Sequence, residues 1–417
     1  MTSFATLRRQ TFASLEIPNY RRYVSGQAIS LVGTWMQSVA QSWLVLTLTH
    51  SATAVGLAVA LQTLPVLVLG PYGGVVADRV DKRRLMMVLQ ATMGLLALAL
   101  GLLTVTGAVQ LWQVYLLALL LGLNNCFENP ARQSFVLEMV GPASLRNAVS
   151  LNSVLVNVAR AVGPAIAGIV IAAGGLGVCF LLNAASFAAV VTSLARLDVS
   201  ALRPSPPAAR APGQLREGLR YVRRTPTLAV PLVMMALVGC LAYEFQVTLP
   251  ILATNTFGAG SEAYGFLTAS MGVGAVVGGL WVAGRGRTGP RAMVLACAGF
   301  GVVLLAVTVA PTLWSAIAAM ALVGVMSIAF TAIGNSSLQL AAAPDMRGRV
   351  MALWAVAFMG TTPIGGPVAG WVAETFGGRA GLALAAAACG LAALLGLTVQ
   401  RRAAGRAAEQ EQAAAPA

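Results

Sequence analysis

Two charged residues stand alone inside long apolar stretches of this sequence. Arg160 lies in NVARAVGPAIAG, residues 157–168, and Glu244 lies in CLAYEFQVTLP, residues 240–250. Because an unpaired charge is costly to bury, each must face a partner or a wet cavity. A carboxyl group in a low dielectric favours its neutral form, which suits a residue that takes up and releases protons. The two residues are therefore candidates for a coupling pair that switches between two states, or for a fixed ion pair.

Other chemistry finds little support in the residue types. The five cysteines occur singly within apolar runs, at positions 126, 179, 240, 297 and 389, without the spacing of metal ligands or of a disulfide framework. His50 is the only histidine, and the sequence contains no Walker loop. We therefore expect no catalytic residue, no metal and no cofactor. An intramembrane enzyme or sensor is the alternative from another class.

The composition is that of a membrane-embedded chain. Of its 417 residues, 58% are apolar and 10% are charged, whereas soluble domains carry about a quarter charged residues. A soluble protein of this size could not cover its surface with so few charges. The net charge of +14 would suggest a nucleic-acid partner in a soluble protein. In a membrane protein, the position of the cationic residues relative to the bilayer instead indicates which side of the membrane each connection faces.

Long apolar runs supply the elements that must position these residues. About 20 apolar residues cross a bilayer, and backbone groups in lipid must pair within their own segment, so each run predicts a helix. We identify twelve, at 23–48, 53–77, 85–106, 110–130, 147–173, 175–197, 228–254, 262–284, 290–310, 312–341, 347–374 and 378–399. The basic, Pro-rich segment 198–227 divides them into halves at 1–197 and 228–400, followed by a tail at 401–417. The second part of that linker is expected to form a basic amphipathic helix on the membrane surface.

Cationic residues gather in alternate connections between these runs. One set holds nearly all of them, at the N-terminus, 78–84, 132–146, 203–224, 285–291, 347–349 and 401–406. The opposite connections contain almost none apart from Arg379. By the positive-inside rule, both termini are expected in the cytoplasm, in a multi-pass protein of the cell (inner) membrane. The net charge then reflects topology and contact with the lipid bilayer, and no nucleic-acid partner is expected.

The two halves carry weak internal repeats in the same order. NPARQ, residues 129–133, matches NSSLQ, residues 335–339, while GPAIAG at 163–168 resembles GPVAG at 366–370. LRNAVSL, residues 145–151, also resembles MRGRVMAL, residues 346–353. Duplicated halves with a site between them are typical of secondary transporters.

A loop between the second and third runs carries the most specific pattern. GGVVADRVDKRR, residues 73–84, resembles the loop signature Gly-x-Leu-Ala-Asp-Arg-x-Gly-Arg-Arg of the major facilitator superfamily, with departures at Val76 and Asp81. GTWMQSVAQSWLVLTLT, NPARQSF and CFLLNAASF further resemble its enterobactin-exporter and macrolide-efflux branch. The resemblance implies an all-α fold of twelve transmembrane helices in two pseudo-symmetric halves.

This loop also supplies candidate gating residues. Asp78 can cap the next helix or pair with an arginine across the two halves, in an ion cluster that breaks when the halves rock. The candidate cluster comprises Gly74, Asp78, Arg79, Lys82, Arg83, Arg84 and Glu128. A solvated loop that only sets topology is the other interpretation.

Polar residues within the spans are candidates for a substrate cavity, since a polar group facing lipid is costly. The set comprises Thr34, Gln37, Gln41, Asn124, Asn125, Asn157, Tyr243 and Asn335. The alternative for these side chains is hydrogen bonding between neighbouring helices. Pro130, at the end of the fourth span, is expected to end or kink its helix.

Glycine and proline in two spans indicate close packing and bending of helices. The candidate positions are Gly163, Pro164, Gly168, Gly366 and Pro367. The first three resemble a span-five signature of superfamily antiporters, although part of its upstream glycine spacing is missing. A seam of small residues that only seals the molecule is the other interpretation.

These observations converge on a monomeric secondary transporter. We expect efflux of amphipathic small molecules, either drugs or siderophore-like metabolites, by alternating access with the proton gradient as energy source. A dedicated metabolite importer is the alternative.

Overall fold

The computed structural model describes residues 12–203, 214–285, 288–343 and 346–414, without the side chains of 71–75, 77–78, 214–216 and 402–414. Every regular element in the described part is helical. The elements are η1 (Ala13–Glu16), α2 (Pro18–Thr49), α3 (Ala52–Arg79), α4 (Lys82–Val105), α5 (Leu111–Gly174), α6 (Leu176–Ala195), η2 (Val199–Ala201), α7 (Gln214–Arg224), α8 (Pro226–Leu241), α9 (Phe245–Ile251), η3 (Leu252–Thr256), α10 (Ser261–Arg285), α11 (Pro290–Thr308), α12 (Leu313–Ala341), α13 (Arg347–Met359), α14 (Thr362–Phe376) and α15 (Gly378–Ala414).

Most of these helices are long and apolar enough to cross a membrane. Ten stretches of the described residues meet that condition. One of them, α5, has 64 residues, which at 1.5 Å per residue suffices for two crossings. Helix α2 adds a further 32 residues. All twelve expected runs fall on helices, which confirms the predicted all-α membrane fold.

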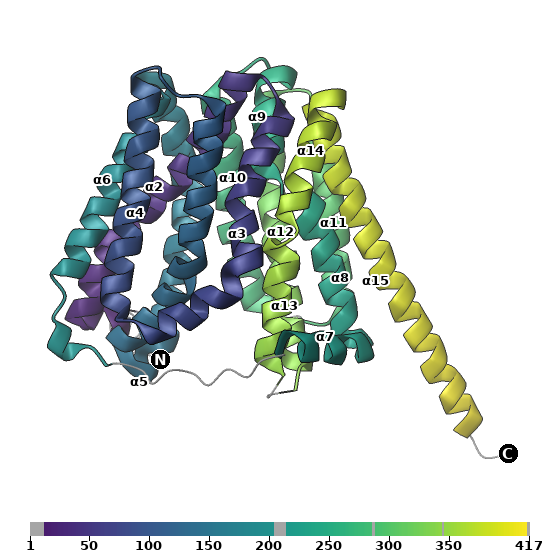
Figure 1. Ribbon diagram of the computed structural model, residues 1–417. Coiled ribbons are helices and arrows are strands. Elements are labelled where there is room, and N and C mark those ends of the chain that lie inside the picture. Colours follow the sequence, from purple (N-terminus) through teal and green to yellow (C-terminus); the bar gives the residue numbers. More distant parts are fainter. Residues whose placement is uncertain (1–11, 204–213, 286–287, 344–345, 415–417) are drawn as a thin grey trace, which may run out of the picture.

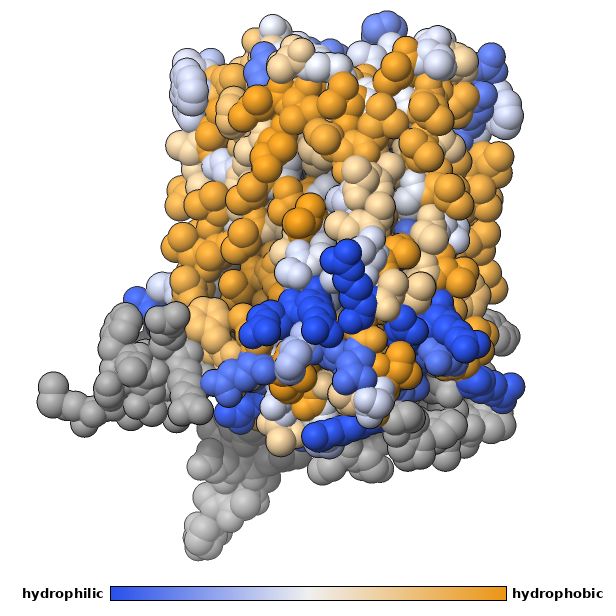
Figure 2. All heavy atoms as spheres, turned by 90° about the vertical axis from the view of Figure 1, so that its left-hand side faces the viewer, coloured by the Kyte–Doolittle hydropathy of each residue, from blue (hydrophilic) through white to orange (hydrophobic). Residues whose placement is uncertain are grey.

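The helices form two groups side by side (Figure 1). Helices α2 to α6 pack among themselves, as do α8 to α15, and the two groups meet where α5 contacts α10 and α3 contacts α14. Helix α2 begins, and α15 ends, at the bottom of Figure 1, which we call the arginine-rich end. The opposite end of the bundle is called the upper end. Figure 2 shows an apolar band above hydrophilic residues that gather at the arginine-rich end.

The linker contains the expected basic helix. Helix α7 lies at the arginine-rich end (Figure 1) and contacts α13 and α8. Arg349 Nη1 lies 2.9 Å from Glu217 Oε1, and the amide of Ala343 donates to the Tyr221 hydroxyl at 3.3 Å. This helix is therefore attached to the second group of helices.

The fourth and fifth spans form a single element with its break at another place than expected. Helix α5 continues through Pro130, so this proline does not end the helix, and the expected kink at this position stays a prediction. The break lies at Gly141, which has φ 71° and ψ 171° and precedes Pro142. Only glycine adopts this backbone region without strain, and the residue before a proline disfavours the α conformation.

Two spans that the sequence presents as continuous are broken near their middle. The span at 228–254 consists of α8, α9 and the π-helical η3, and the span at 347–374 consists of α13 and α14. Pro363 explains the second break, because proline removes an amide donor and clashes with the carbonyl four residues earlier. Both breaks lie in the second half of the chain, and they place Glu244 opposite the start of α14.

Candidate functional site

The first contact between the two halves joins α3 and α14 near the upper end. Gly56 and Gly366 approach so closely that a methyl group on Gly56 would overlap the Gly366 carbonyl oxygen. One turn higher, a methyl group on Gly370 would lie 2.5 Å from the Ala52 carbonyl oxygen. Backbones touch in this way only where side chains are absent. This contact is called the α3–α14 seam.

Glu374 closes the top of that seam with hydrogen bonds. Its Oε2 accepts from the Ser51 hydroxyl at 2.6 Å and from the Thr53 amide at 2.9 Å. Ser51 also caps the start of α3 through the Ala54 amide. A carboxylate of the second half thus holds the first turn of a helix in the first half.

The second contact joins α5 and α10, and it also lies toward the upper end. A methyl group on Gly265 would lie 2.5 Å from the Pro164 carbonyl oxygen, and one on Gly272 would lie 2.6 Å from the Ala161 Cα. Trp43 of α2 stacks on Tyr264 of α10 with ring centroids 6.2 Å apart. This contact is called the α5–α10 seam.

Below the α5–α10 seam, one face of α5 is polar and accessible. Ser153 is exposed and Asn157 is partly exposed, and both lie on the side of the helix that carries Arg160. The close contacts with α10 extend from Gly168 down to Ala161. The halves are therefore closely packed toward the upper end, and polar α5 side chains are accessible toward the arginine-rich end.

Glu244 lies at the break between α8 and α9. Its side chain is 4% exposed, and its Oε1 has no hydrogen-bond partner among the described residues. The carboxylate contacts α14, since methyl groups on Gly365 and Gly366 would lie 3.1 Å from Oε1 and 3.5 Å from Oε2. The amides and dipole at the start of a helix favour a nearby negative charge. The beginning of α14 thus provides the surroundings of this carboxylate.

Arg160 does not pair with Glu244 in this structure. Its guanidinium carbon lies 4.9 Å from the centre of the Trp35 ring, a cation–π contact with the neighbouring helix α2. Its Nε is buried without a hydrogen-bond partner, and no ion pair joins it to Glu244 in the described part of the chain. The side chain lies within electrostatic range of Tyr243, the neighbour of Glu244. The expected ion pair is thus not formed, although the two residues approach the same region from opposite halves.

The candidate gating residues make contacts within the first half. Lys82 Nζ lies 2.7 Å from Glu138 Oε1, and Arg83 donates to the Leu194 and Ala195 carbonyl oxygens at 2.8 Å each. The Arg84 amide donates to Asp81, so Asp81 caps α4, a role expected of Asp78.

Two further gating residues have surroundings other than those expected. Glu128 lies 3.1 Å from Arg132 Nε and accepts from the Gln90 amide at 3.4 Å, so its observed partners come from α5 and α4 and not from the 78–84 loop. Arg79 is exposed at the end of α3. The surroundings of Gly74 and of the Asp78 side chain lie outside the described residues. A gate between the halves at this end stays a prediction.

The polar residues of the first span mostly face neighbouring helices. Gln37 accepts a hydrogen bond from Asn183 of α6 at 2.6 Å, and Gln41 donates to Gln62 of α3 at 3.5 Å. Both glutamines are buried, which agrees with the alternative that they connect helices. Thr34 is exposed and donates to the Ser30 carbonyl oxygen.

The remaining cavity candidates differ in how far their polar groups are satisfied. The amide nitrogen of Asn124 is buried without a partner, and Asn125 is partly exposed. Asn157 donates to the Ser153 carbonyl oxygen at 2.8 Å, and Asn335 accepts from Gln339 at 2.6 Å. Tyr243 donates to the Ser327 carbonyl oxygen at 2.9 Å and contacts three phenylalanine rings, those of Phe245, Phe300 and Phe358.

The glycine and proline positions of the fifth and eleventh spans lie in or beside the two seams. Pro164 and Gly168 contact α10, whereas Gly163 packs on α2, where its methyl group would lie 2.6 Å from the Trp35 Cβ. Gly366 and Pro367 contact Gly56 of α3. Neither proline interrupts its helix.

Several residues of this region escape sequence reasoning. Glu374 and Ser51 lie far apart in the sequence and only the packing of the halves joins them. Gly365 approaches the Cys240 carbonyl oxygen, freed by the end of α8, so closely that a methyl group would overlap it. In the sequence, the Gly365–Gly366 pair before Pro367 indicates a close backbone contact. The break between α8 and α9, which frees the carbonyl oxygen that Gly365 approaches, cannot be predicted from the sequence.

Metal chemistry receives no support from the described residues, among which no group of three His, Cys, Asp or Glu side chains is placed to hold an ion.

Comparison with known proteins agrees with this architecture. A family model described as transmembrane secretion effector matches residues 1–416. The staphyloferrin A transporter of Staphylococcus aureus is 25% identical over 61% of this chain and 64% of its own length, so the match spans less than two thirds of that relative. The enterobactin exporter EntS of Shigella boydii is 29% identical over 81% of both chains. These relatives are transporters and not enzymes.

Solved structures share the fold at low sequence identity. The nucleoside transporter NupG has a TM-score of 0.70 at 14% identity, covering 94% of this chain and 98% of its own. A bacterial homologue of the human lysosomal transporter Spinster has a TM-score of 0.72 at 14% identity, covering 92% and 97%. With the model match across the chain, these comparisons show that this multi-pass membrane protein belongs to the transmembrane secretion effector family of the major facilitator superfamily.

Proposed function

We propose that this protein exports amphipathic, siderophore-like small molecules from the cytoplasm by proton antiport. The observation that carries the proposal is Glu244, a buried carboxylate with an unpartnered oxygen at the break of a span, beside the seam between the halves. The names of the relatives support the substrate class, since they include an enterobactin exporter and a staphyloferrin A transporter. The arginine-rich end is assigned to the cytoplasm on the positive-inside rule.

In this mechanism the structure represents the inward-facing state. Substrate enters from the arginine-rich end and meets the polar face of α5, with Arg160 at its top. The seams then part at the upper end, and the halves close at the other end, where residues 73–84, at the end of α3 and the start of α4, form the gate. Rocking of two pseudo-symmetric halves about a central site is how such folds alternate access.

Glu244 couples this movement to the proton. Its contact with Gly366 places it directly beside the α3–α14 seam, so opening the seam changes its access to water. A carboxyl group is easier to keep neutral when buried and easier to ionise when hydrated. Proton uptake at the outer side and release at the inner side would thus accompany opposite movements of substrate.

The test uses the full chain in inverted vesicles and in liposomes. With Glu244→Gln, we expect uptake of enterobactin or staphyloferrin A into inverted vesicles to lose its dependence on the proton gradient, whereas gradient-free exchange of labelled substrate persists. Glu262→Gln changes an exposed carboxylate at the start of α10 and serves as the control. Retained exchange shows that the variant is folded.

Three outcomes overturn parts of this proposal. Transport by Glu244→Gln that still responds to an uncoupler removes the coupling role. Substrate accumulation in right-side-out vesicles but not in inverted vesicles indicates an importer. If neither siderophore is transported but amphipathic fluorescent drugs accumulate, the substrates are drugs and not siderophores.

A further inference from the structure

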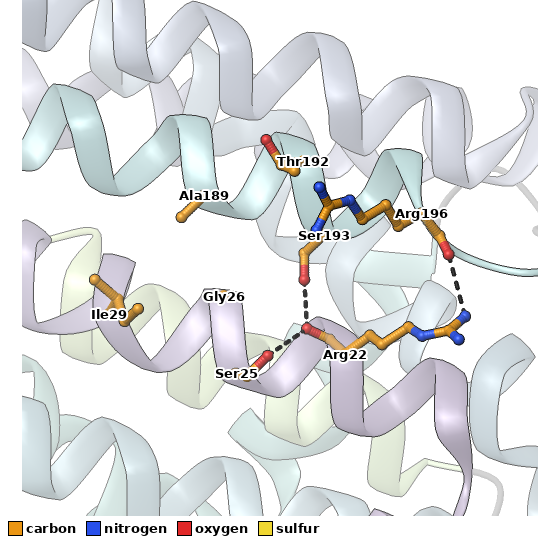
Figure 3. Close-up of a pocket in the computed structure, with 8 residues that line it drawn as sticks. All are labelled: Arg22, Ser25, Gly26, Ile29, Ala189, Thr192, Ser193 and Arg196. Atoms are coloured by element: carbon orange, nitrogen blue, oxygen red, sulfur yellow. Dashed lines mark hydrogen bonds between the residues drawn. The ribbon is translucent and has the colours of Figure 1, made fainter.

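A second site lies outside the seams, between the ends of α2 and α6. A pocket of about 470 Å³ opens there at the arginine-rich end of the bundle. Figure 3 shows its lining, which α2 and α6 contribute in equal parts: Arg22, Ser25, Gly26, Ile29, Ala189, Thr192, Ser193 and Arg196. None of these residues belongs to the transport path described above.

The pocket has a polar end and an apolar end. Arg22 and Arg196 lie at the ends of their helices nearest the aqueous phase, followed by hydroxyl residues about one turn further along. Ile29, which is 59% exposed, and Ala189 lie at the other end. Ile29 lies seven positions after Arg22 in α2, which corresponds to about 10 Å along a helix. This gradient matches an amphiphile whose head group faces the aqueous phase.

The cationic side chains are available at the pocket. Arg22 donates to the Arg196 carbonyl oxygen at 3.2 Å through one of its five N–H groups. The Arg196 side chain, which lines the pocket, runs back along α6 toward Ser193 and Thr192 (Figure 3). In the described part of the chain no carboxylate lines the pocket. Asp198, which follows nearby, already accepts from the Ser200 hydroxyl at 2.6 Å and the Ser200 amide at 3.0 Å.

The backbone holds the two arginines in place. A methyl group on Gly26 would lie 3.1 Å from Ser193 Cβ, and the Ser193 hydroxyl donates to the Arg22 carbonyl oxygen, so α2 and α6 pack closely beneath the pocket. Arg83 donates to the last carbonyl oxygens of α6, which fixes the helix end that carries Arg196. The floor of the pocket is thus a built contact between two helices.

We propose that this pocket binds the phosphate head group of an anionic lipid, with its acyl chains along Ile29 and Ala189. Guanidinium groups bind phosphate through paired hydrogen bonds, and the serine and threonine hydroxyls add further donors. The site faces the lipid leaflet next to the arginine-rich end, where anionic lipids attract basic residues. This lipid-binding proposal does not depend on the identity of the transported substrate or of the coupling ion.

The test is native mass spectrometry of the purified full chain in detergent. Short-chain phosphatidylglycerol is titrated against phosphatidylcholine with the same acyl chains, and the occupancy of the first bound lipid is measured. We expect the wild type to prefer phosphatidylglycerol. Arg22→Gln and Arg196→Gln should each weaken its binding about fivefold, and the double variant about 25-fold.

Arg291→Gln is the matched control, because Arg291 is an exposed arginine at the same end of the second half. It should change the binding by less than twofold, as expected of a charge that only sets topology. An equal loss in Arg291→Gln, or unchanged binding in the double variant, overturns the site. Binding of inorganic phosphate as tight as that of phosphatidylglycerol identifies a small-anion site and overturns the lipid assignment.

Discussion

The two Gly-Pro elements, at 163–164 and 366–367, occupy related places in the two halves but serve different contacts. Gly163 lies against Trp35 within its own half, and only the Pro164 carbonyl oxygen reaches across to Gly265. Gly366 instead faces the other half directly and also contacts Glu244. The element in α5 carries an arginine one turn earlier in a continuous helix, whereas the element in α14 receives a carboxylate from a broken span.

This difference indicates that the two seams have different roles in transport. Beside the α5–α10 seam, Arg160 stacks on Trp35 of α2, and α5 runs without a break from Pro142 onward. Beside the α3–α14 seam lies Glu244, whose Oε1 has no hydrogen-bond partner among the described residues, at a place where two spans are interrupted. Breaks in helices expose backbone groups that can rearrange. We therefore expect the α3–α14 seam to respond to protons and the α5–α10 seam to respond to substrate.

The largest effects are expected from adding one methyl group to a seam. In Gly56→Ala the new atom meets the Gly366 carbonyl oxygen, and in Gly265→Ala it lies 2.5 Å from the Pro164 carbonyl oxygen. Overpacking costs about 1–3 kcal/mol, and here it applies only while the upper end is closed. Each variant should therefore shift the equilibrium about 5- to 160-fold toward the upper-open state.

Spin labels at Thr106→Cys and Val309→Cys, in upper connections of opposite halves, measure that shift as a longer distance. Gly390→Ala is the control, because a methyl group at this position in α15 would have no neighbour within 4 Å. An unchanged distance distribution in both seam variants would show that the seams do not limit opening.

Intermediate effects are expected at the two charges. Arg160→Gln removes the cation that stacks on Trp35, and we expect transport of an anionic siderophore to fall at least about tenfold, since a charge-assisted contact contributes about 1.5–3 kcal/mol. Arg160→Lys keeps the charge but lacks the planar group that stacks on Trp35, so its transport rate should fall less than that of Arg160→Gln. The measurement is initial uptake into inverted vesicles.

A double-mutant cycle with Glu244→Gln then decides whether the two charges pair in another state. If they do, the loss in the double variant is smaller than the product of the single losses by about fivefold or more. Multiplicative losses mean that Arg160 and Glu244 act separately. Arg160 would then act on the substrate alone.

The smallest effect is expected at the top of the α3–α14 seam. Glu374→Gln weakens two hydrogen bonds at an exposed position, where such contacts contribute about 0.5–1 kcal/mol. The same spin labels should report a two- to fivefold shift toward the upper-open state. A shift as large as that of Gly56→Ala would mean that the carboxylate, and not the glycine contact, holds the seam closed.

Much of the fold follows from local properties of the chain. Apolar runs of membrane length predict helices because lipid offers no hydrogen bonds, and all twelve runs are helical. The breaks did not follow. Pro130 predicted a helix end or a kink, and the helix does not end there, whereas nothing in 228–254 predicted the interruption at Glu244. A proline inside a membrane helix ends it only if the neighbouring helices fail to accommodate it.

The site was predictable in its residue types more than in its pairings. A lone arginine and a lone glutamate in apolar runs signal buried charges wherever the helices lie. Their partners depend on packing, which placed Arg160 on Trp35 and Glu244 against the start of α14. The glutamines of the first span likewise gained partners on α6 and α3 that no local pattern specifies.

The sequence by itself thus determined which stretches are helical and which end of the bundle is rich in arginine, because hydropathy and charge act on each segment separately. Only the tertiary structure decided which glycines meet, that Glu374 reaches Ser51, and that the two buried charges remain apart. Those contacts depend on two halves packing against each other, so they arise between residues far apart in the chain.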